Sequence, residues 1–297
     1  MPELPEVETV KRGLQRLLRG LTITHVSNDN PKSFPNADAD VGQFLVGASI
    51  VEVTRRAKVL LIELSSKYSL MIHLKMTGQL VYRAPAAADG APVQFGAGHP
   101  SDSLIGELPD RSTRVIFDFD NDAHLYFNDQ RKFGWVRLIP TAEIPQIDFF
   151  KKVGPEPLAE DFTWQTMQGR LTRRKNTNIK AALLDQTVIA GVGNIYADEG
   201  LWGAKIHPTT LVRNLKDSDF KHLHQALRDV LQLSIDKGGS TDHTYVDAEG
   251  KRGSYMSFAN VFRREGQPCN RCGTIIEKTR VAGRGTHTCP YCQRPAN

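Results

Sequence analysis

Four cysteines near the end of the chain constrain its fold more than any other feature. They form two pairs, Cys269-x-x-Cys272 and Cys289-x-x-Cys292, and the chain has no other cysteine. Each pair lets two thiolates meet one ion, and two pairs complete a closed tetrahedral set of the kind that a structural Zn²⁺ ion prefers. A disulfide framework would instead spread its cysteines through the chain. The spacing therefore predicts one structural zinc ion.

The segment between the two pairs predicts a β-hairpin. It reads TIIEKTRVAGRGTHT, and we expect the turn at Gly283-Arg284-Gly285. No pair of histidines follows, so the module is a zinc ribbon rather than a ββα finger. Arg280 and Arg284 would then project from a hairpin held by the metal. Zinc ribbons occur in many kinds of protein, so the module alone indicates only a small folded unit that is often found on nucleic acid.

Hydrophobic periodicity divides the rest of the chain in two. Residues 3–19 read as a helix that ends at Gly20, and the following region reads as short strands of an antiparallel sandwich or barrel, separated by turn residues. The expected strands are 21–28, 48–57, 59–65, 69–76, 79–84, 114–120, 123–128 and 134–139. Residues 84–112, rich in Ala, Gly, Pro and Ser, are expected to form a long loop within this region.

The second half of the chain reads as helical. Proline and acidic residues suggest a linker over 140–162, and helices are expected over 163–172, 177–186, 194–203 and 217–237, with Asn194 as the cap of the third. The fold class is therefore α+β. We expect a catalytic β-sandwich domain over 1–139, the linker, a helical domain over 163–257 and the zinc module over 258–297.

Charge is distributed unevenly. The 297 residues carry a net charge of +5, but residues 1–150 hold 16 basic and 18 acidic side chains, whereas residues 151–297 hold 22 and 15. The second half is thus the better candidate for binding a polyanion. No apolar run approaches the ~18–20 residues of a membrane span, and the charged start MPELPEVETVKRG has no signal-peptide core. We therefore expect a cytosolic protein with no membrane partner.

The first residues carry a second chemical signal. Removal of the initiator methionine would expose Pro2, a secondary amine that forms an iminium ion with an aldehyde-like carbon, and whose ammonium pKa lies nearer neutrality than that of lysine (roughly 8 against 10.4). Glu3 and Glu6, one helical turn apart, are placed to deliver a proton. From these residues alone, a favourable helix start is the simpler interpretation, because acidic residues suit the first turn.

Several motifs together resemble bacterial formamidopyrimidine-DNA glycosylase over essentially the whole chain. They are PELPEVE (2–8), HLKMTGQL (73–80), NDQRKFG (128–134), QTVIAGVGNIYADE (186–199) and VAGRGTHTCPYCQ (281–293). The resemblance implies a helix–two-turns–helix motif in the helical domain. It also implies a monomeric base-excision-repair enzyme that acts on double-stranded DNA with oxidised bases or abasic sites. Such enzymes remove oxidised purines, notably 8-oxoguanine and formamidopyrimidines, and then cut the strand by β,δ-elimination.

The same resemblance implies the catalytic roles. Pro2 is the expected nucleophile at the sugar C1′, forming a Schiff base, Glu3 the general acid and Glu6 a supporting acid. Lys58 corresponds to a strand lysine assigned to phosphate contact and to proton transfer in β-elimination. Arg284 corresponds to an arginine that grips the phosphates flanking the lesion and acts in δ-elimination.

Further positions correspond to DNA contacts. Met76, Arg131 and Phe133 match residues that fill the space left by a flipped nucleotide, which must leave the stack to be reached. Without the motifs, Met76 and Phe133 would read as core residues. Lys180 and Asn194 match phosphate-binding positions, although Lys180 alone would read as an exposed helix lysine.

The chain departs from the family at three places. Many members carry Tyr-Gly-Arg where this chain has Phe262-Arg263-Arg264. They often carry paired histidines that touch DNA where this chain has Arg111-Ser112-Thr113-Arg114. Ser112 replaces one of these contacts, and we expect the charges of Arg111 and Arg114 to compensate, with Arg114 contacting DNA. The loop expected to close over the flipped base, about 238–256, is also unusual in sequence, so the order of lesion preference stays open.

Two alternatives remain at this stage. An endonuclease VIII-type glycosylase, specialised in oxidised pyrimidines, would share Pro2, Glu3 and the zinc hairpin, but Leu4 favours the purine branch. A non-catalytic DNA-binding zinc protein would need the basic second half but would have no use for Pro2, Glu3 and Lys58.

Overall fold

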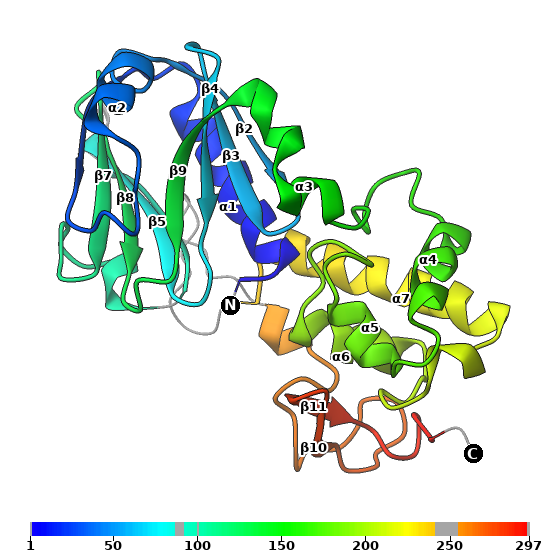
Figure 1. Ribbon diagram of the computed structural model, residues 1–297. Helices are drawn as coiled ribbons and strands as arrows, with labels where there is room; N and C mark the ends of the chain where they lie inside the picture. Colours follow the sequence, from blue (N-terminus) through cyan, green and yellow to red (C-terminus); the bar gives the residue numbers. More distant parts are fainter. Residues whose placement is uncertain (1, 87–91, 100, 241–254, 296–297) are drawn as a thin grey trace. The chain divides into compact units, whose positions relative to one another are not determined.

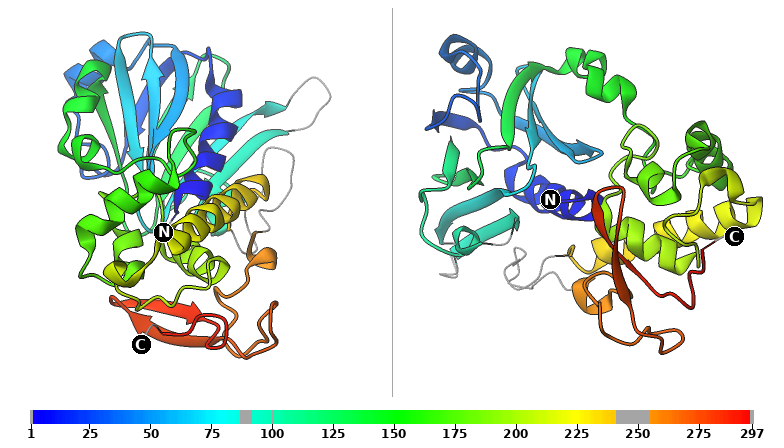
Figure 2. Two further views of the ribbon diagram at one scale, coloured as in Figure 1. Left: turned by 90° about the vertical axis from the view of Figure 1, so that its right-hand side faces the viewer. Right: turned by 60° about the horizontal axis from the view of Figure 1, so that its bottom comes forward.

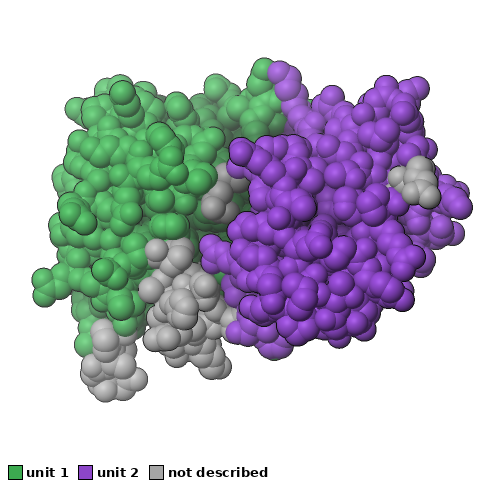
Figure 3. Space-filling view, turned by 90° about the horizontal axis from the view of Figure 1, so that it is seen from below, with its two compact units in different colours: residues 1–151, 237–254 green, residues 152–236, 255–297 purple. Residues whose placement is uncertain are grey.

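The computed structural model describes residues 2–86, 92–99, 101–240 and 255–295. The chain forms two compact units, coloured separately in Figure 3. The first contains Met1–Lys151 and Lys237–Ser254, and the second contains Lys152–Asp236 and Tyr255–Asn297. The first unit therefore includes residues 237–254, which the sequence pattern assigns to the helical domain.

The first unit is a β-sandwich with a helix at its side (Figure 1). All strand pairs are antiparallel. One sheet has the order β1 (Ile23–Asn28), β7 (Thr113–Phe119), β8 (His124–Asp129), β5 (Gly78–Ala86) and β6 (Pro92–Gly98), and the other has β2 (Ile50–Arg56), β3 (Val59–Leu64), β4 (Tyr68–His73) and β9 (Trp135–Pro140). The predicted α+β class and sandwich are confirmed.

Helix α1 (Leu4–Leu18) packs against an edge strand of each sheet, β2 and β6. Its apolar residues recur at helical spacing, and Val7, Val10, Leu14 and Leu18 join the buried core of the sandwich. Gly13 lets the helix approach β6 closely, because a Cβ atom there would lie 2.2 Å from the ring of Phe95.

One expectation for this unit is wrong. Residues 84–112 are not one long loop, because β5 continues to Ala86, β6 pairs with it, and a 3₁₀ turn η1 (Asp102–Leu104) follows. The boundary between the two units lies within the predicted linker 140–162, which carries η2 (Thr141–Gln146) and α3 (Asp148–Lys152). Helix α2 (Asp38–Phe44) was not expected at all.

The second unit contains the expected helices within two residues at most ends. They are α4 (Trp164–Leu171), α5 (Ile179–Leu184), α6 (Asn194–Gly203) and α7 (Asp217–Asp236), with short 3₁₀ turns η3 (Thr172–Arg174), η4 (Val212–Asn214) and η5 (Tyr255–Phe258). They enclose a separate core in which Tyr196, Phe220 and Tyr255 are the largest of the fully buried side chains. Within the described residues, no helix is both long and apolar enough to cross a bilayer.

The zinc module contains the predicted hairpin between its two cysteine pairs, formed by β10 (Glu277–Val281) and β11 (Arg284–Thr288) and shown in red in Figure 2. The turn lies one residue earlier than expected, at Ala282 and Gly283, whose φ angles are +51° and +74°. Positive φ at both central residues is the geometry of a type I′ turn. Arg284 is therefore the first residue of β11, paired with Val281, and not the middle of the turn.

Candidate functional site

The start of α1 holds the predicted catalytic acids in a reciprocal cap. The Glu3 carboxylate accepts the backbone N–H of Glu6, and the Glu3 N–H donates to Glu6 Oε2 at 2.8 Å. Glu6 Oε1 accepts the N–H of Ser240 at 2.8 Å, so both oxygens of Glu6 are engaged. Pro2, Glu3 and Glu6 are all buried. The structure thus brings the three residues together, with Glu6 holding the backbone of Glu3.

Lys58 lies in the turn between β2 and β3 and is only 6% exposed. Strand β2 is tied to α1 by an ion pair of 2.7 Å between Arg55 and Glu8. Glu8 follows Glu3 by little more than one helical turn, and Arg55 precedes Lys58 by three residues. This ion pair therefore sets how the start of α1 and the turn with Lys58 are aligned within the unit.

His73, at the end of β4, is a site residue that sequence reasoning did not select. Burial, together with the positive charges of Lys75 and Lys58, lowers the pKa of His73 to about 3. Its Nδ1 accepts the N–H of Lys75 at 2.9 Å, so in the neutral ring the proton lies on Nε2. His73 belongs to the motif HLKMTGQL, but a lone histidine in a strand carries no further signal in the sequence.

The three expected DNA-inserting residues lie on two loops. Met76 lies between β4 and β5, and Arg131 and Phe133 lie between β8 and β9. Met76 and Phe133 are 40% and 54% exposed, so their alternative assignment to the core is wrong. The Arg131 guanidinium lies 4.8 Å from the centre of the Phe133 ring, a cation–π contact between two exposed side chains.

Asp129 joins these two loops and was also missed. It is fully buried, and its Oδ1 accepts the hydroxyl of Thr77 and the backbone N–H of Arg131, while Oδ2 accepts the N–H of Gly134 at 2.6 Å. Gly134 has no room for a side chain, because a Cβ atom would lie 2.8 Å from the Phe127 ring. Asp129 lies within the motif NDQRKFG, which was the only signal for it.

Arg114 does not take the expected place at the surface. It is 5% exposed, and its guanidinium donates to the carbonyl oxygens of Asp129 and Arg111 and to the Asp29 carboxylate. The neighbouring Ser112 is also buried and donates to Asp110. All these contacts lie within the β-sandwich, so the expectation that Arg114 offers its guanidinium to DNA needs correction.

The four cysteines are gathered as a zinc site requires. Their sulfur atoms all lie within 4.8 Å of one another, with 3.4 Å between Cys272 and Cys289 and 3.5 Å between Cys272 and Cys292. A tetrahedral ion with bonds of about 2.3 Å would separate its sulfurs by about 3.8 Å, so the set fits Zn²⁺. Hydrogen bonds from Thr274 lower the pKa of the Cys272 thiol to about 6, which favours the ligating thiolate.

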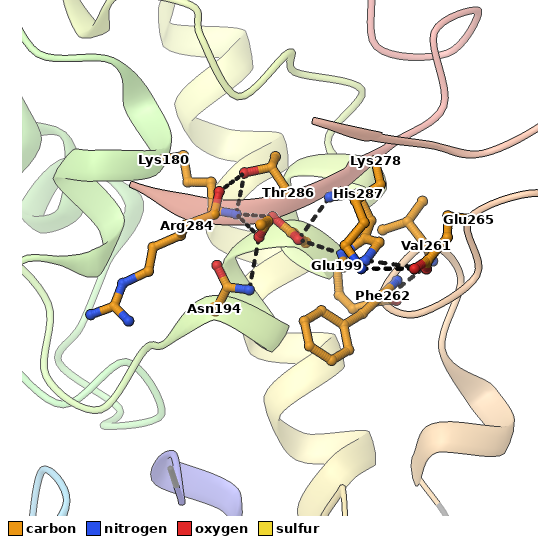
Figure 4. A network of polar contacts seen from close by, with 12 residues as sticks. Lys180, Asn194, Glu199, Val261, Phe262, Glu265, Lys278, Arg284, Thr286 and His287 are labelled. Carbon is orange, nitrogen blue, oxygen red and sulfur yellow. Dashed lines mark hydrogen bonds and ion pairs between the residues drawn. The ribbon is translucent and has the colours of Figure 1, made fainter. Parts of the chain in front are cut away.

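Asn194 and Arg284 belong to the second unit. Asn194 is the first residue of α6 after the N-cap Gly193, and it does not cap the helix as expected. Its side-chain amide donates to the carbonyl of Gly285 at 3.0 Å instead. The Arg284 side chain is exposed and extends away from the polar cluster in Figure 4.

Lys180 lies in the protein interior, which contradicts both of its predicted positions. The side chain is 0% exposed. Its ammonium group donates to Asp198 Oδ1 at 2.7 Å, to Thr286 Oγ1 at 2.7 Å and to the Gly285 carbonyl at 3.1 Å. Three bonds use all three ammonium protons. Lys180 is therefore neither a surface lysine nor a direct ligand of phosphate.

Glu199, next to Asp198 on α6, organises the approach to the zinc module. Its buried carboxylate accepts the backbone N–H groups of Asn260, Val261 and Phe262 at 2.8–2.9 Å. Burial raises the pKa of Glu199, and these hydrogen bonds oppose that rise. Arg263 follows with a φ of +57°, in the region that favours glycine, which explains the glycine of the related motif. Most of the loop 238–256 lies outside the described residues.

Comparisons with known proteins account for this arrangement. The family described as "Formamidopyrimidine-DNA glycosylase N-terminal domain" matches residues 1–136, the "Formamidopyrimidine-DNA glycosylase H2TH domain" matches 153–246, and the "Zinc finger found in FPG and IleRS" matches 266–295. These three domains in this order define a class of zinc-bearing DNA-repair glycosylases. The chain belongs to the formamidopyrimidine-DNA glycosylase family within that class.

Individual relatives match over their whole length. The chain is 42% identical to the formamidopyrimidine-DNA glycosylase of Pelotomaculum thermopropionicum over 295 residues, which is 99% of each chain. It is 42% identical to that of Chloroflexus aurantiacus over 294 residues, or 99% of this chain and 98% of the relative. A Lactococcus lactis FPG variant bound to Fapy-dG-containing DNA superposes with a TM-score of 0.85 at 35% identity, covering 99% and 100% of the two chains.

Two other solved structures of the Lactococcus lactis protein show the ligands of that relative. One is a complex with abasic-site DNA, with a TM-score of 0.85 at 35% identity over 98% of this chain and 99% of that chain. The other is a complex with DNA containing an oxidised pyrimidine, with a TM-score of 0.83 at 35% identity over 99% and 100%.

Proposed function

We propose that this chain is a base-excision-repair DNA glycosylase that removes oxidised purines, 8-oxoguanine and formamidopyrimidines, and then cuts the strand at the resulting abasic site. The observation that carries the proposal is the reciprocal cap at the start of α1, which holds Glu3 beside Pro2 in a full-length member of this family. Both carboxylates are buried beside the expected nucleophile, although glutamate side chains are rarely buried.

Pro2 supplies the nucleophile once Met1 has been removed. Its secondary amine attacks the sugar C1′, the damaged base leaves, and the iminium ion formed at C1′ makes the neighbouring carbon acidic enough for β-elimination. Glu3 donates a proton as the sugar opens or the base leaves. Glu6 acts through Glu3, because both of its oxygens are occupied by backbone N–H groups.

Lys58 and His73 form the part of this site that faces the phosphate backbone. Lys58 takes the proton-transfer role in β-elimination. Because the His73 pKa lies far below neutrality, the ring is uncharged at pH 7 and offers the Nε2–H to a phosphate oxygen without adding a third positive charge beside Lys58 and Lys75.

The exposed loop residues fill the duplex where the damaged nucleotide has left it. Met76 and Phe133 are apolar wedges of the kind that unstack base pairs, and Arg131 can donate hydrogen bonds to the orphaned partner base, expected to be cytosine. Asp129 keeps the two loops together through Thr77 and the backbone of residues 131 and 134.

The second unit holds the DNA backbone. Arg284 on β11 and Asn194 at the start of α6 are its expected phosphate contacts, and helix N-termini favour phosphate. Zn²⁺, bound by Cys269, Cys272, Cys289 and Cys292, supplies structural support to the hairpin and no chemistry. The basic second half predicts binding that weakens steeply with salt. We place the enzyme in the bacterial cytoplasm, associated with the nucleoid through its substrate.

Borohydride trapping tests the mechanism. The protein, with its N-terminus verified by mass spectrometry, is mixed with duplex DNA carrying 8-oxoguanine opposite cytosine. We expect a covalent protein–DNA adduct whose yield collapses in Pro2→Gly, in Glu3→Gln and in protein that retains Met1. An adduct of wild-type yield in either variant would refute the mechanism, and no adduct with authentic protein would favour a non-catalytic DNA-binding protein.

A parallel duplex tests the second candidate substrate. Because the Lactococcus lactis relative has been solved with oxidised-pyrimidine DNA, the same assay is run with an oxidised pyrimidine at the lesion position. We expect faster trapping on 8-oxoguanine. Faster trapping on the pyrimidine duplex would assign the chain to the endonuclease VIII type of activity.

A further inference from the structure

A buried polar cluster ties the hairpin to α5 and α6 (Figure 4). Lys180 on α5 and Asp198 on α6 are both 0% exposed and form an ion pair of 2.7 Å. Asp198 Oδ2 accepts the backbone N–H of His287 at 3.0 Å, and Lys180 donates to Gly285 and Thr286. The pair therefore holds three consecutive residues of β11 from two different helices.

The cluster reaches the backbone of Arg284 through one hydroxyl group. Thr286 Oγ1 accepts a hydrogen bond from Lys180 Nζ at 2.7 Å and donates one to the carbonyl oxygen of Arg284 at 3.1 Å. The next carbonyl, that of Gly285, accepts from both Lys180 and Asn194, at 3.1 and 3.0 Å. Both peptide groups that follow Arg284 are thus fixed, while its side chain remains exposed.

Stability does not explain this arrangement. Removing two charges from water is costly, and apolar residues of similar volume usually support a fold equally well. An exposed ion pair of 2.8 Å between Lys278 and Glu265 lies on the same module and reaches neither carbonyl. What the buried pair provides, and the exposed pair does not, is a defined position for the backbone that carries Arg284.

We propose that Lys180 and Asp198 form a positioning pair that sets Arg284 and Asn194 at the spacing of successive phosphates on one DNA strand. The inference rests on the proposed function, in which those two residues contact phosphate. The pair touches neither DNA nor the reacting atoms, and it acts through Thr286 and the Gly285 carbonyl. Binding then needs no ordering of the hairpin, and that ordering would otherwise reduce affinity.

A double-mutant cycle on the full-length, zinc-loaded protein tests this. Lys180→Met combined with Asp198→Asn removes the charges together and retains an oxygen for the His287 N–H. Zinc content and the thermal midpoint establish that the variant folds, and the Kd for DNA with an abasic-site analogue is then measured. We expect one zinc per chain and a Kd raised about tenfold. Adding Arg284→Gln to this variant should raise the Kd much less than it does in the wild type, because the positioning is already lost.

Thr286→Val provides a second route if the double variant does not fold. It keeps the side-chain volume and removes the hydroxyl through which Lys180 reaches the Arg284 carbonyl. It also takes one of three acceptors from the buried ammonium group, so its zinc content and thermal midpoint are measured as well. We expect a smaller rise in Kd that again disappears in the Arg284→Gln background. Lys278→Gln combined with Glu265→Gln is the matched control, since it also removes one positive and one negative charge from an ion pair on the same module, and it should change the Kd less than threefold.

Each outcome decides one point. If Arg284→Gln alone leaves the Kd unchanged, the proposed phosphate contact fails and the positioning inference fails with it. If Arg284→Gln weakens binding but the folded positioning variants bind like the wild type, only the positioning inference is overturned. Fully additive losses would also overturn it, because they would mean that Lys180 and Arg284 act independently.

Discussion

Gly13→Ala is a sharp test of how the fold places the start of α1. Alanine in a helix interior is normally favoured over glycine by about 1 kcal/mol. At position 13, however, the new Cβ would lie 2.2, 2.3 and 2.9 Å from three ring atoms of Phe95, which is itself only 2% exposed. Overpacking of this kind costs about 1–3 kcal/mol. With contacts this short the upper end applies, so we expect a net loss of about 2 kcal/mol.

Gly169→Ala is the matched control, because Gly169 lies in α4 and a Cβ atom there meets nothing within 4 Å. It should raise the free energy of unfolding by about 1 kcal/mol. Urea unfolding followed by circular dichroism measures both variants. Phe95→Leu should relieve the clash with the new Cβ atom. The double variant Gly13→Ala, Phe95→Leu should therefore lose less stability than the sum of the losses of the two single variants. A Gly13→Ala protein as stable as the wild type would refute the close packing of α1 on β6.

Three further predictions concern single side chains. As pH falls from about 6.5 to about 3, the unfolded state binds a proton that His73 does not bind in the folded state, so this residue should lower the free energy of unfolding by up to about 1.4 kcal/mol per pH unit. Carboxyl groups such as Glu8 and Asp110 titrate in the same range, so urea titrations should show a steeper slope in the wild type than in His73→Gln, and equal slopes would contradict this. Trp202→Phe should speed zinc loss to a colorimetric chelator, since it removes the indole N–H donated to Cys269 Sγ at 3.4 Å, and an unchanged rate would contradict this. Arg263→Gly should raise the free energy of unfolding by about 0.5–1 kcal/mol and with it the thermal midpoint, because glycine adopts the backbone φ of +57° without strain. An unchanged or lower midpoint would contradict this.

Local pattern was sufficient to predict most of the secondary structure. Apolar residues at helical spacing identified α1 and α7, and alternating apolar runs identified eight of the nine strands of the sandwich. Strand β6 was missed although Val93, Phe95 and Ala97 alternate, because Pro92, Gly96 and Gly98 in the same segment are typical of a loop. Its place is decided by pairing with β5 and by packing on α1, which are contacts between distant parts of the chain.

In the candidate site, too, contacts between distant parts of the chain could not be predicted from the sequence. Residue type suggested that Lys180 and Arg114 meet solvent or DNA, since such side chains are rarely buried unless paired. Their partners lie far away in sequence: Lys180 contacts Thr286, and Arg114 contacts the Asp29 carboxylate. A single sequence does not reveal such pairs, whereas the cysteines were predictable because both ligand pairs are local and the metal joins them.

Helix α6 explains why one short motif carries so much of the second unit. Asn194 donates to the Gly285 carbonyl, and Asp198 accepts the backbone N–H of His287 in the hairpin. Glu199 accepts the backbone N–H of Val261, and Trp202 donates to the sulfur of the zinc ligand Cys269. These polar groups act beside the buried apolar residues Tyr196, Ala197 and Leu201, which pack into the core of the unit. Hydrogen bonds are directional, whereas apolar contacts are not, so a helix that holds its neighbours in this way fixes their orientation as well as their distance. That precision suits the role proposed for this unit, in which Arg284 and Asn194 contact phosphates of the DNA backbone.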